Sequence, residues 1–103
     1  MSIRISNQQS KAISALAERH GVARLDLFGS AATDAFDPDT SDIDVLVVFK
    51  SDLPDGRFKA FFGLQSGLAT LFGRPVDLVS ENSVQNPYLL RSMNRTRRLL
   101  YVA

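Results

Sequence analysis

The sequence predicts a small α/β (or α+β) domain in which helices pack against one mixed β-sheet. Apolar residues recur at helical intervals in 7–20 and 57–72, whereas 22–28 and 43–49 are short apolar runs bounded by turn residues. The predicted order is helix, strand, short helix, strand, helix, strand, helix, strand, and this alternation favours helices layered on a sheet. The 103 residues suffice for one hydrophobic core but not two, so we expect a single domain over 1–103.

The first half of the chain carries clear start and stop signals. Ser6 to Gln9 has the form of a capping box, which predicts a helix that ends near His20 and Gly21. At that helix end, we expect His20 to be a favourable charge on the helix dipole. A strand over Val22–Phe28 stops at Gly29-Ser30, and a short helix follows. The turn residues in 37–40 then lead into a second strand, Ile43–Phe49.

The second half continues the same alternation. A helix is predicted over Arg57–Phe72, with two glycines four residues apart, Gly63 and Gly67, that permit close packing. We favour the sheet over a partner helix as the surface on which they pack. A short strand is expected over 75–79, and a helix begins at Pro87 and runs to about Asn94. The residues 99–102 form the last expected strand.

Composition excludes several classes of protein. The chain is 45% hydrophobic and 22% charged, with a net charge of +1, so nothing global directs it to nucleic acid. It has no cysteine, which excludes disulfides, thiolate metal sites and cysteine nucleophiles. No apolar run reaches the roughly 20 residues of a membrane helix. The N-terminus MSIRISNQQ has no signal-peptide core, so we expect a cytoplasmic protein.

Two carboxylates mark the start of the second strand. Because side chains alternate along a strand, Asp42 and Asp44 are expected on the same face, where they repel each other. A divalent cation, which prefers hard oxygen ligands, would remove that cost. Asp-x-Asp alone is a weak signal. The neighbouring sequence strengthens this signal, because Gly29-Ser30 lies between a strand and a helix, where backbone N–H groups can hold phosphate. A third carboxylate, Asp77, is expected on the face opposite its apolar neighbours Val76 and Leu78.

The ordered set of Gly29-Ser30, then Asp42 and Asp44, then Asp77 resembles the nucleotidyltransferase superfamily that includes DNA polymerase β. The chain is most similar to the smallest branch, the minimal nucleotidyltransferases, which include the MNT-type antitoxins. The resemblance covers nearly the whole chain, from the first helix to Tyr101. It implies the polymerase β-like nucleotidyltransferase fold.

The resemblance also implies a chemistry for each residue. Gly29 and Ser30 would hold the triphosphate of ATP, and Asp42 and Asp44 would ligate two Mg²⁺ ions. Asp77 would help hold the second metal and assist deprotonation of the acceptor hydroxyl. The implied activity is Mg²⁺-dependent transfer of AMP to a hydroxyl on a partner protein. Members of this branch are commonly paired, as the antitoxin, with a small helical toxin of the HEPN type.

The sequence departs from the branch at one place and leaves alternatives open. Many members follow the Gly-Ser turn with Ala-Arg-Gly, but Thr33 and Asp34 follow Ala32 here, so an arginine near the phosphates is missing. Arg74 is the nearest candidate to replace that charge. A catalytically silent nucleotide- or partner-binding antitoxin is the second hypothesis. Transfer to RNA or to a small molecule such as an aminoglycoside is the third, but we see no segment that would bind such an acceptor.

Overall fold

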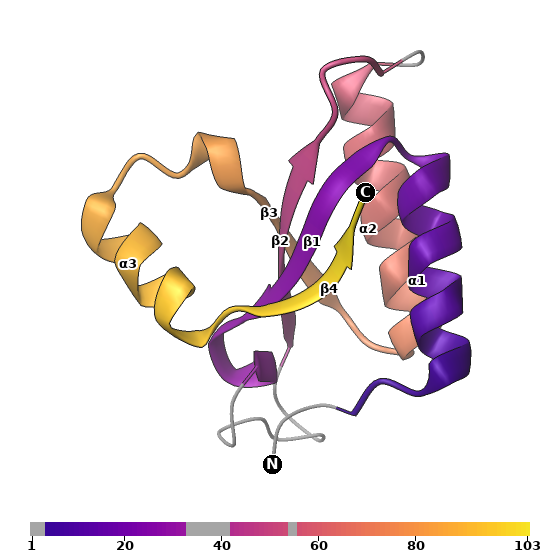
Figure 1. Ribbon diagram of the computed structural model, residues 1–103, viewed down its shortest axis with the longest axis horizontal. Coiled ribbons are helices and arrows are strands. Elements are labelled where there is room, and N and C mark those ends of the chain that lie inside the picture. The colour runs from indigo at the N-terminus through magenta and orange to yellow at the C-terminus, as the bar shows by residue number, and fades with distance from the viewer. Residues whose placement is uncertain (1–3, 33–41, 54–55) are drawn as a thin grey trace.

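A four-stranded sheet organises the chain (Figure 1). The computed structural model describes residues 4–32, 42–53 and 56–103. Within these residues the strands are β1 (Val22–Phe28), β2 (Ile43–Phe49), β3 (Val76–Ser80) and β4 (Arg98–Val102). The α-helices are α1 (Asn7–Arg19), α2 (Arg57–Phe72) and α3 (Pro87–Thr96), and the two short 3₁₀ turns are η1 (Gly29–Ala32) and η2 (Glu81–Ser83). None of the described helices is long and apolar enough to span a membrane.

The sheet is mixed, as the sequence predicts. Its strand order is β3-β2-β1-β4, with β1 antiparallel to both β2 and β4 and with β2 parallel to β3. A parallel pair needs a long crossover connection, and α2 supplies it between β2 and β3. The two ends of the crossover therefore lie at opposite ends of the sheet, and β2 and β3 begin at the same end.

Helices α1 and α2 cover one face of the sheet, and α3 with η2 lies on the other side (Figure 1). The core fills the space between the sheet and α1 and α2. Its members are the apolar residues whose side chains point to that face. They include Ile13 and Ala17 from α1, Leu25 and Leu27 from β1, Ile43, Val45 and Val47 from β2, Leu64 and Leu68 from α2, and Val76 and Leu78 from β3.

The two glycines of α2 pack against α1 and not against the sheet, so that prediction is corrected. A Cβ atom on Gly63 would lie 2.6 Å from the ring of His20, and one on Gly67 would lie 2.6 Å from a methyl group of Leu16. Because neither position has room for a side chain, α1 and α2 can approach closely. The tight packing expected of these glycines is present, but its partner is a helix.

His20 also behaves differently from the prediction. It caps the C-terminus of α1 as expected, but its ring packs on Gly63 of α2. Burial, and then the positive charge of Arg19, lower the pKa of the His20 imidazole below its ordinary value. The fold therefore favours neutral His20, so it is not the charged partner of the helix dipole that the sequence suggested.

Most predicted boundaries are confirmed to within two residues. Ser6 accepts a hydrogen bond from the Gln9 backbone, the Gln9 side chain accepts one from the Ser6 backbone, and Asn86 caps α3. The strand after α2 begins and ends one residue later than predicted, α3 continues to Thr96, and η2 is not among the predicted elements. The predicted turn at 37–40 lies outside the described residues.

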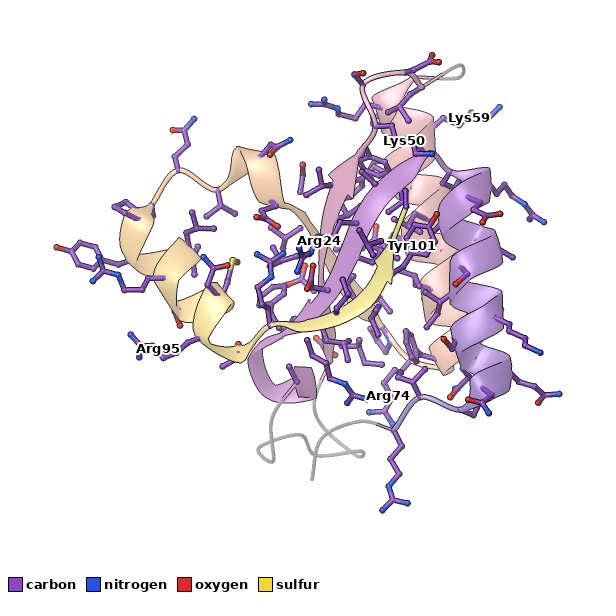
Figure 2. The ribbon with its side chains drawn as sticks, viewed as in Figure 1. Arg24, Lys50, Lys59, Arg74, Arg95 and Tyr101 are labelled. Carbon is purple, nitrogen blue, oxygen red and sulfur yellow. The ribbon has the colours of Figure 1, made fainter. Side chains whose placement is uncertain are left out.

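The face of the sheet toward α3 carries a buried charged network that joins distant parts of the chain. Asp26 on β1 is only 1% exposed and accepts hydrogen bonds from Arg24 Nε at 2.7 Å and from Arg97 Nη2 at 2.8 Å. Arg97 also donates to Glu81 at 2.8 Å. Figure 2 shows Arg24 on this side of β1. Because Arg97 follows α3 and Glu81 begins η2, the network fastens both elements to β1.

Burial alone would raise the pKa of Asp26, but hydrogen bonds from Arg24 and Arg97 outweigh it and leave the pKa below its ordinary value. The native state therefore favours the ionised carboxylate. Asp26 contributes this stability above its unfolded-state pKa of 3.8, and the contribution is lost as the pH falls through the lower folded-state value.

We predict that Asp26→Asn lowers the free energy of unfolding by roughly 3 kcal/mol at neutral pH, because it leaves Arg97 in the network without its buried counter-charge. Urea denaturation measures the change. The same substitution at Asp52, which is exposed in the loop after β2, is the matched control and should change stability little. Equal stability of the two variants would contradict a stabilising role for the network.

Candidate active site

Asp44 and Asp77 lie side by side on the face of the sheet opposite α1 and α2. They are the second residues of β2 and β3, and they are direct partners in the parallel register. Their chain neighbours Ile43 and Val45, and Val76 and Leu78, are buried on the helix side. Because side chains alternate along each strand, both carboxylates must point to the opposite face, as the sequence predicts.

Asp42 stands just before β2 and is exposed. It is two residues from Asp44, and its charge acts on that carboxylate. Burial raises the pKa of Asp44, and the negative charges of Asp77 and then Asp42 raise it further. The ionised form of Asp44 is therefore disfavoured when no cation is present, and a bound cation would reverse that preference.

The three aspartates do not by themselves make a closed metal cage. In residues 4–32, 42–53 and 56–103, no three or more histidine, cysteine, aspartate or glutamate side chains gather closely enough to hold a metal ion. The pair formed by Asp44 and Asp77 is open to solvent on the Asp77 side. Mg²⁺ is usually held by one or two carboxylates together with waters and substrate phosphates, so an open pair of this kind suits it.

Gly29 lies against Asp44. Phe28, the last residue of β1, pairs with Asp44 across the antiparallel ladder, and Gly29 follows with a backbone φ of +63°. A Cβ atom on Gly29 would lie 2.9 Å from Oδ2 of Asp44. Both the left-handed backbone and this close approach require glycine. The structure thus brings the predicted turn, Gly29 with Ser30 as the second residue of η1, to the same end of β2 as the carboxylates.

The backbone N–H of Gly29 donates a hydrogen bond to Thr96 Oγ1 at 3.0 Å. Thr96 is the last residue of α3, 67 positions along the chain. No local sequence pattern predicts this contact, because a threonine at the end of a helix is common and its partner depends on the tertiary fold.

Arg74 lies at the end of the sheet where β1 ends and β2 begins (Figure 2). It precedes β3 on the connection from α2, and the N–H of Ile43 donates to the carbonyl of Pro75 at 3.3 Å. Arg74 therefore lies at the same end of the sheet as Asp44, whereas its action on a phosphate remains a prediction. Thr33 and Asp34 lie outside the described residues.

A cavity of about 250 Å³ occurs at the other end of β2, away from the aspartates. Its lining, as far as the described residues form it, includes Arg19, His20, Leu53 and Lys59 but no carboxylate. The carboxylates lie elsewhere, with Asp42 and Asp77 exposed and Asp44 half-buried.

The chain matches the family described as the nucleotidyltransferase domain over residues 9–100. A relative from Methanocaldococcus jannaschii, named as a putative protein adenylyltransferase, is 38% identical over 87 residues, which are 84% of this chain and 83% of the relative. These matches include Gly29, Ser30 and all three aspartates within their span.

Solved structures share the fold. One described as a putative minimal nucleotidyltransferase superposes with a TM-score of 0.72 at 31% identity and covers 88% of each chain. A toxin–antitoxin structure with AMP-PNP gives 0.69 at 24% identity, over 91% of this chain and 73% of the other. A tri-AMPylated Shewanella oneidensis HEPN toxin in complex with its MNT antitoxin gives 0.62 at 23%, over 91% and 70%.

The chain thus has a mixed sheet, a glycine turn against Asp44 and a pair of carboxylates. It also matches one family along almost its whole length. The chain belongs to the nucleotidyltransferase family, within its branch of minimal nucleotidyltransferases.

Proposed function

We propose that this nucleotidyltransferase moves AMP from ATP to a hydroxyl group of a partner protein in a Mg²⁺-dependent reaction. The observation that carries the proposal is the placement of Asp44 beside Asp77, with Gly29 in contact with Asp44. It brings a glycine turn, of the kind that can bind anions, and two carboxylates, of the kind that can bind cations, to one end of β2.

The donor set fits Mg²⁺. All three candidate ligands are carboxylates, and the charges of Asp77 and Asp42 raise the pKa of Asp44, which a cation would lower. In the proposal Asp42 and Asp44 would hold two Mg²⁺ ions together with the triphosphate, and Asp77 would help to hold the second. Two bound metal ions stabilise both the attacking and the leaving oxygen of a phosphoryl transfer.

The remaining roles fall to the protein's own groups. Gly29 and Ser30 hold the triphosphate through the backbone turn, and Gly29 keeps a side chain out of the space beside Asp44. Asp77 accepts the proton of the acceptor hydroxyl as that oxygen attacks the α-phosphorus atom, the bond between the α-phosphorus and the bridging oxygen breaks, and pyrophosphate leaves. Asp77 suits this role because its side chain is exposed, whereas Asp44 is half-buried.

The proposed acceptor is a tyrosine hydroxyl of a small helical toxin of the HEPN type, which this chain would neutralise as an antitoxin in the cytoplasm. The support comes from the relatives. One is named a putative protein adenylyltransferase, and one solved structure of this fold contains an AMPylated HEPN toxin with its MNT antitoxin.

A catalytically silent antitoxin is the second candidate. The observation in its favour is Thr33-Asp34, which replaces the positive charge expected after the Gly-Ser turn with a negative one. In this case the protein would bind its partner but transfer no AMP.

We predict that Asp44→Asn leaves the metal-free protein as stable as the wild type or more stable at neutral pH. The amide removes a charge that burial and the neighbouring aspartates disfavour. The raised pKa makes this gain present above the folded-state pKa, and the gain disappears as the pH falls below the unfolded-state value of 3.8.

The same variant should lose the rise in melting temperature that Mg²⁺ with ATP gives the wild type. Thermal melts with and without Mg²⁺ and ATP measure both effects, and Asp52→Asn is the matched control. A clear loss of metal-free stability in Asp44→Asn alone would show that Asp44 is a structural residue.

We predict that Asp77→Asn separates binding from transfer. Asp42 and Asp44 still hold one metal and the triphosphate, so the dissociation constant for Mg²⁺-ATP should stay within several-fold of wild type. The proton acceptor beside the attacking oxygen is lost, so transfer should fall by about 10²-fold or more.

Label transfer from ATP to proteins in a lysate of the native host measures this step. Label on the α-phosphate should appear on a protein, whereas label on the γ-phosphate should not, which excludes phosphorylation. Equal transfer by wild type and Asp77→Asn would refute the mechanism. No transfer by wild type, with a partner still bound, would favour the silent antitoxin.

A further inference from the structure

We propose that Thr96 is a positioning residue that holds the Gly29-Ser30 turn against Asp44 from the end of α3. The inference rests on the proposed function, because it assigns Thr96 a part in nucleotide binding. It starts from a contact that neither the motif nor the proposed mechanism includes, the hydrogen bond from the Gly29 N–H to Thr96 Oγ1.

The hydroxyl of Thr96 is oriented for this role. It donates its own proton to the carbonyl of Met93 at 3.4 Å, so a lone pair of Oγ1 is left to accept the N–H of Gly29 at 3.0 Å. A threonine that bonds back into its own helix is common, but here the same oxygen reaches a different element. Both hydrogen bonds are partly buried.

Contacts on both sides of Thr96 hold the end of α3 in place. Thr96 can therefore hold Gly29 in a fixed position. Met93, one helical turn earlier, is 5% exposed and is buried on the sheet side of α3. Arg97, the next residue, forms ion pairs with Asp26 on β1 and with Glu81 in η2, both at 2.8 Å. Arg97 thus joins the end of α3 to the middle of β1, and Thr96 joins it to the turn that follows β1.

The hydrogen bond to Thr96 also determines which backbone groups of the turn are left to bind phosphate. Since the N–H of Gly29 is bonded to Thr96, the backbone donors for phosphate have to come from the residues after Gly29 in η1. Gly29 then contributes in two other ways. It has no side chain that would collide with Asp44, and its left-handed backbone allows η1 to lie beside Asp44. Loss of the Thr96 hydroxyl would release the turn from this position.

The test compares Thr96→Val, which keeps the shape but loses the hydroxyl, with Thr96→Ser, which keeps the hydroxyl. Thr70→Val is the matched control, because Thr70 Oγ1 also donates back into its own helix, at 3.0 Å to Ser66, but on the exposed surface of α2. Two quantities are measured. One is amide hydrogen exchange of Gly29 by NMR, and the other is calorimetric affinity for Mg²⁺ with α,β-methylene ATP, whose α–β bond cannot be cleaved.

In Thr96→Val the Gly29 amide should exchange faster and the dissociation constant should rise about five-fold, the equivalent of one ordinary hydrogen bond. Thr96→Ser and Thr70→Val should match the wild type in both measurements. A purely structural role would lower the melting temperature of Thr96→Val without changing the affinity of the folded protein.

Unchanged affinity in Thr96→Val, with wild type binding the nucleotide, would overturn the positioning role and leave the proposed function intact. Tighter binding would also overturn it, because it would mean that Thr96 competes with the phosphate for the Gly29 amide. If wild type does not bind the nucleotide at all, the proposed function fails, and the assignment of Thr96 fails with it.

Discussion

The parallel register between β2 and β3 is the constraint on which the site depends. It pairs Ile43 with Val76, Asp44 with Asp77 and Val45 with Leu78, so that each apolar pair faces the helices and the acidic pair faces away. A slip of one residue would turn Asp77 into the core and Leu78 to the solvent. The burial of Val76 and Leu78 therefore fixes the position of the Asp77 carboxylate.

That arrangement has an electrostatic cost in the unliganded protein. Asp44 is half-buried, next to one carboxylate and two residues from another, and its pKa is raised as a result. The same face offers a contrast at Asp26, where two arginines more than offset the burial of the carboxylate and its pKa is lowered. Two acids on neighbouring positions of one face thus have opposite environments. Asp44, for which the described residues offer no cationic partner, lies beside the turn suited to phosphate, which is the pattern expected of a functional group.

Much of the fold and of the candidate site could be predicted from the sequence, because the signals for them are local. Alternation around Asp44 and Asp77 gives their face, the capping box at Ser6 starts α1, and Asn86-Pro87 starts α3. Contacts between residues far apart in the sequence were missed, because no local pattern predicts them. Thr96 and Gly29 are 67 residues apart, and Arg97 and Asp26 are 71 apart, so only the folded sheet brings them together. The packing of Gly63 and Gly67 was assigned to the wrong partner because a glycine pair predicts close approach without saying to what.

The proposed reaction requires that Asp42, Asp44 and Asp77 bind a divalent metal together with a nucleotide triphosphate. A crystal structure with Mn²⁺ and α,β-methylene ATP tests it most directly, because anomalous scattering locates manganese independently of the protein. We expect anomalous peaks in contact with the Asp44 carboxylate and with the phosphates, and the phosphates along the turn that follows Gly29. A nucleotide bound elsewhere, or manganese with no contact to Asp44, would contradict the claim.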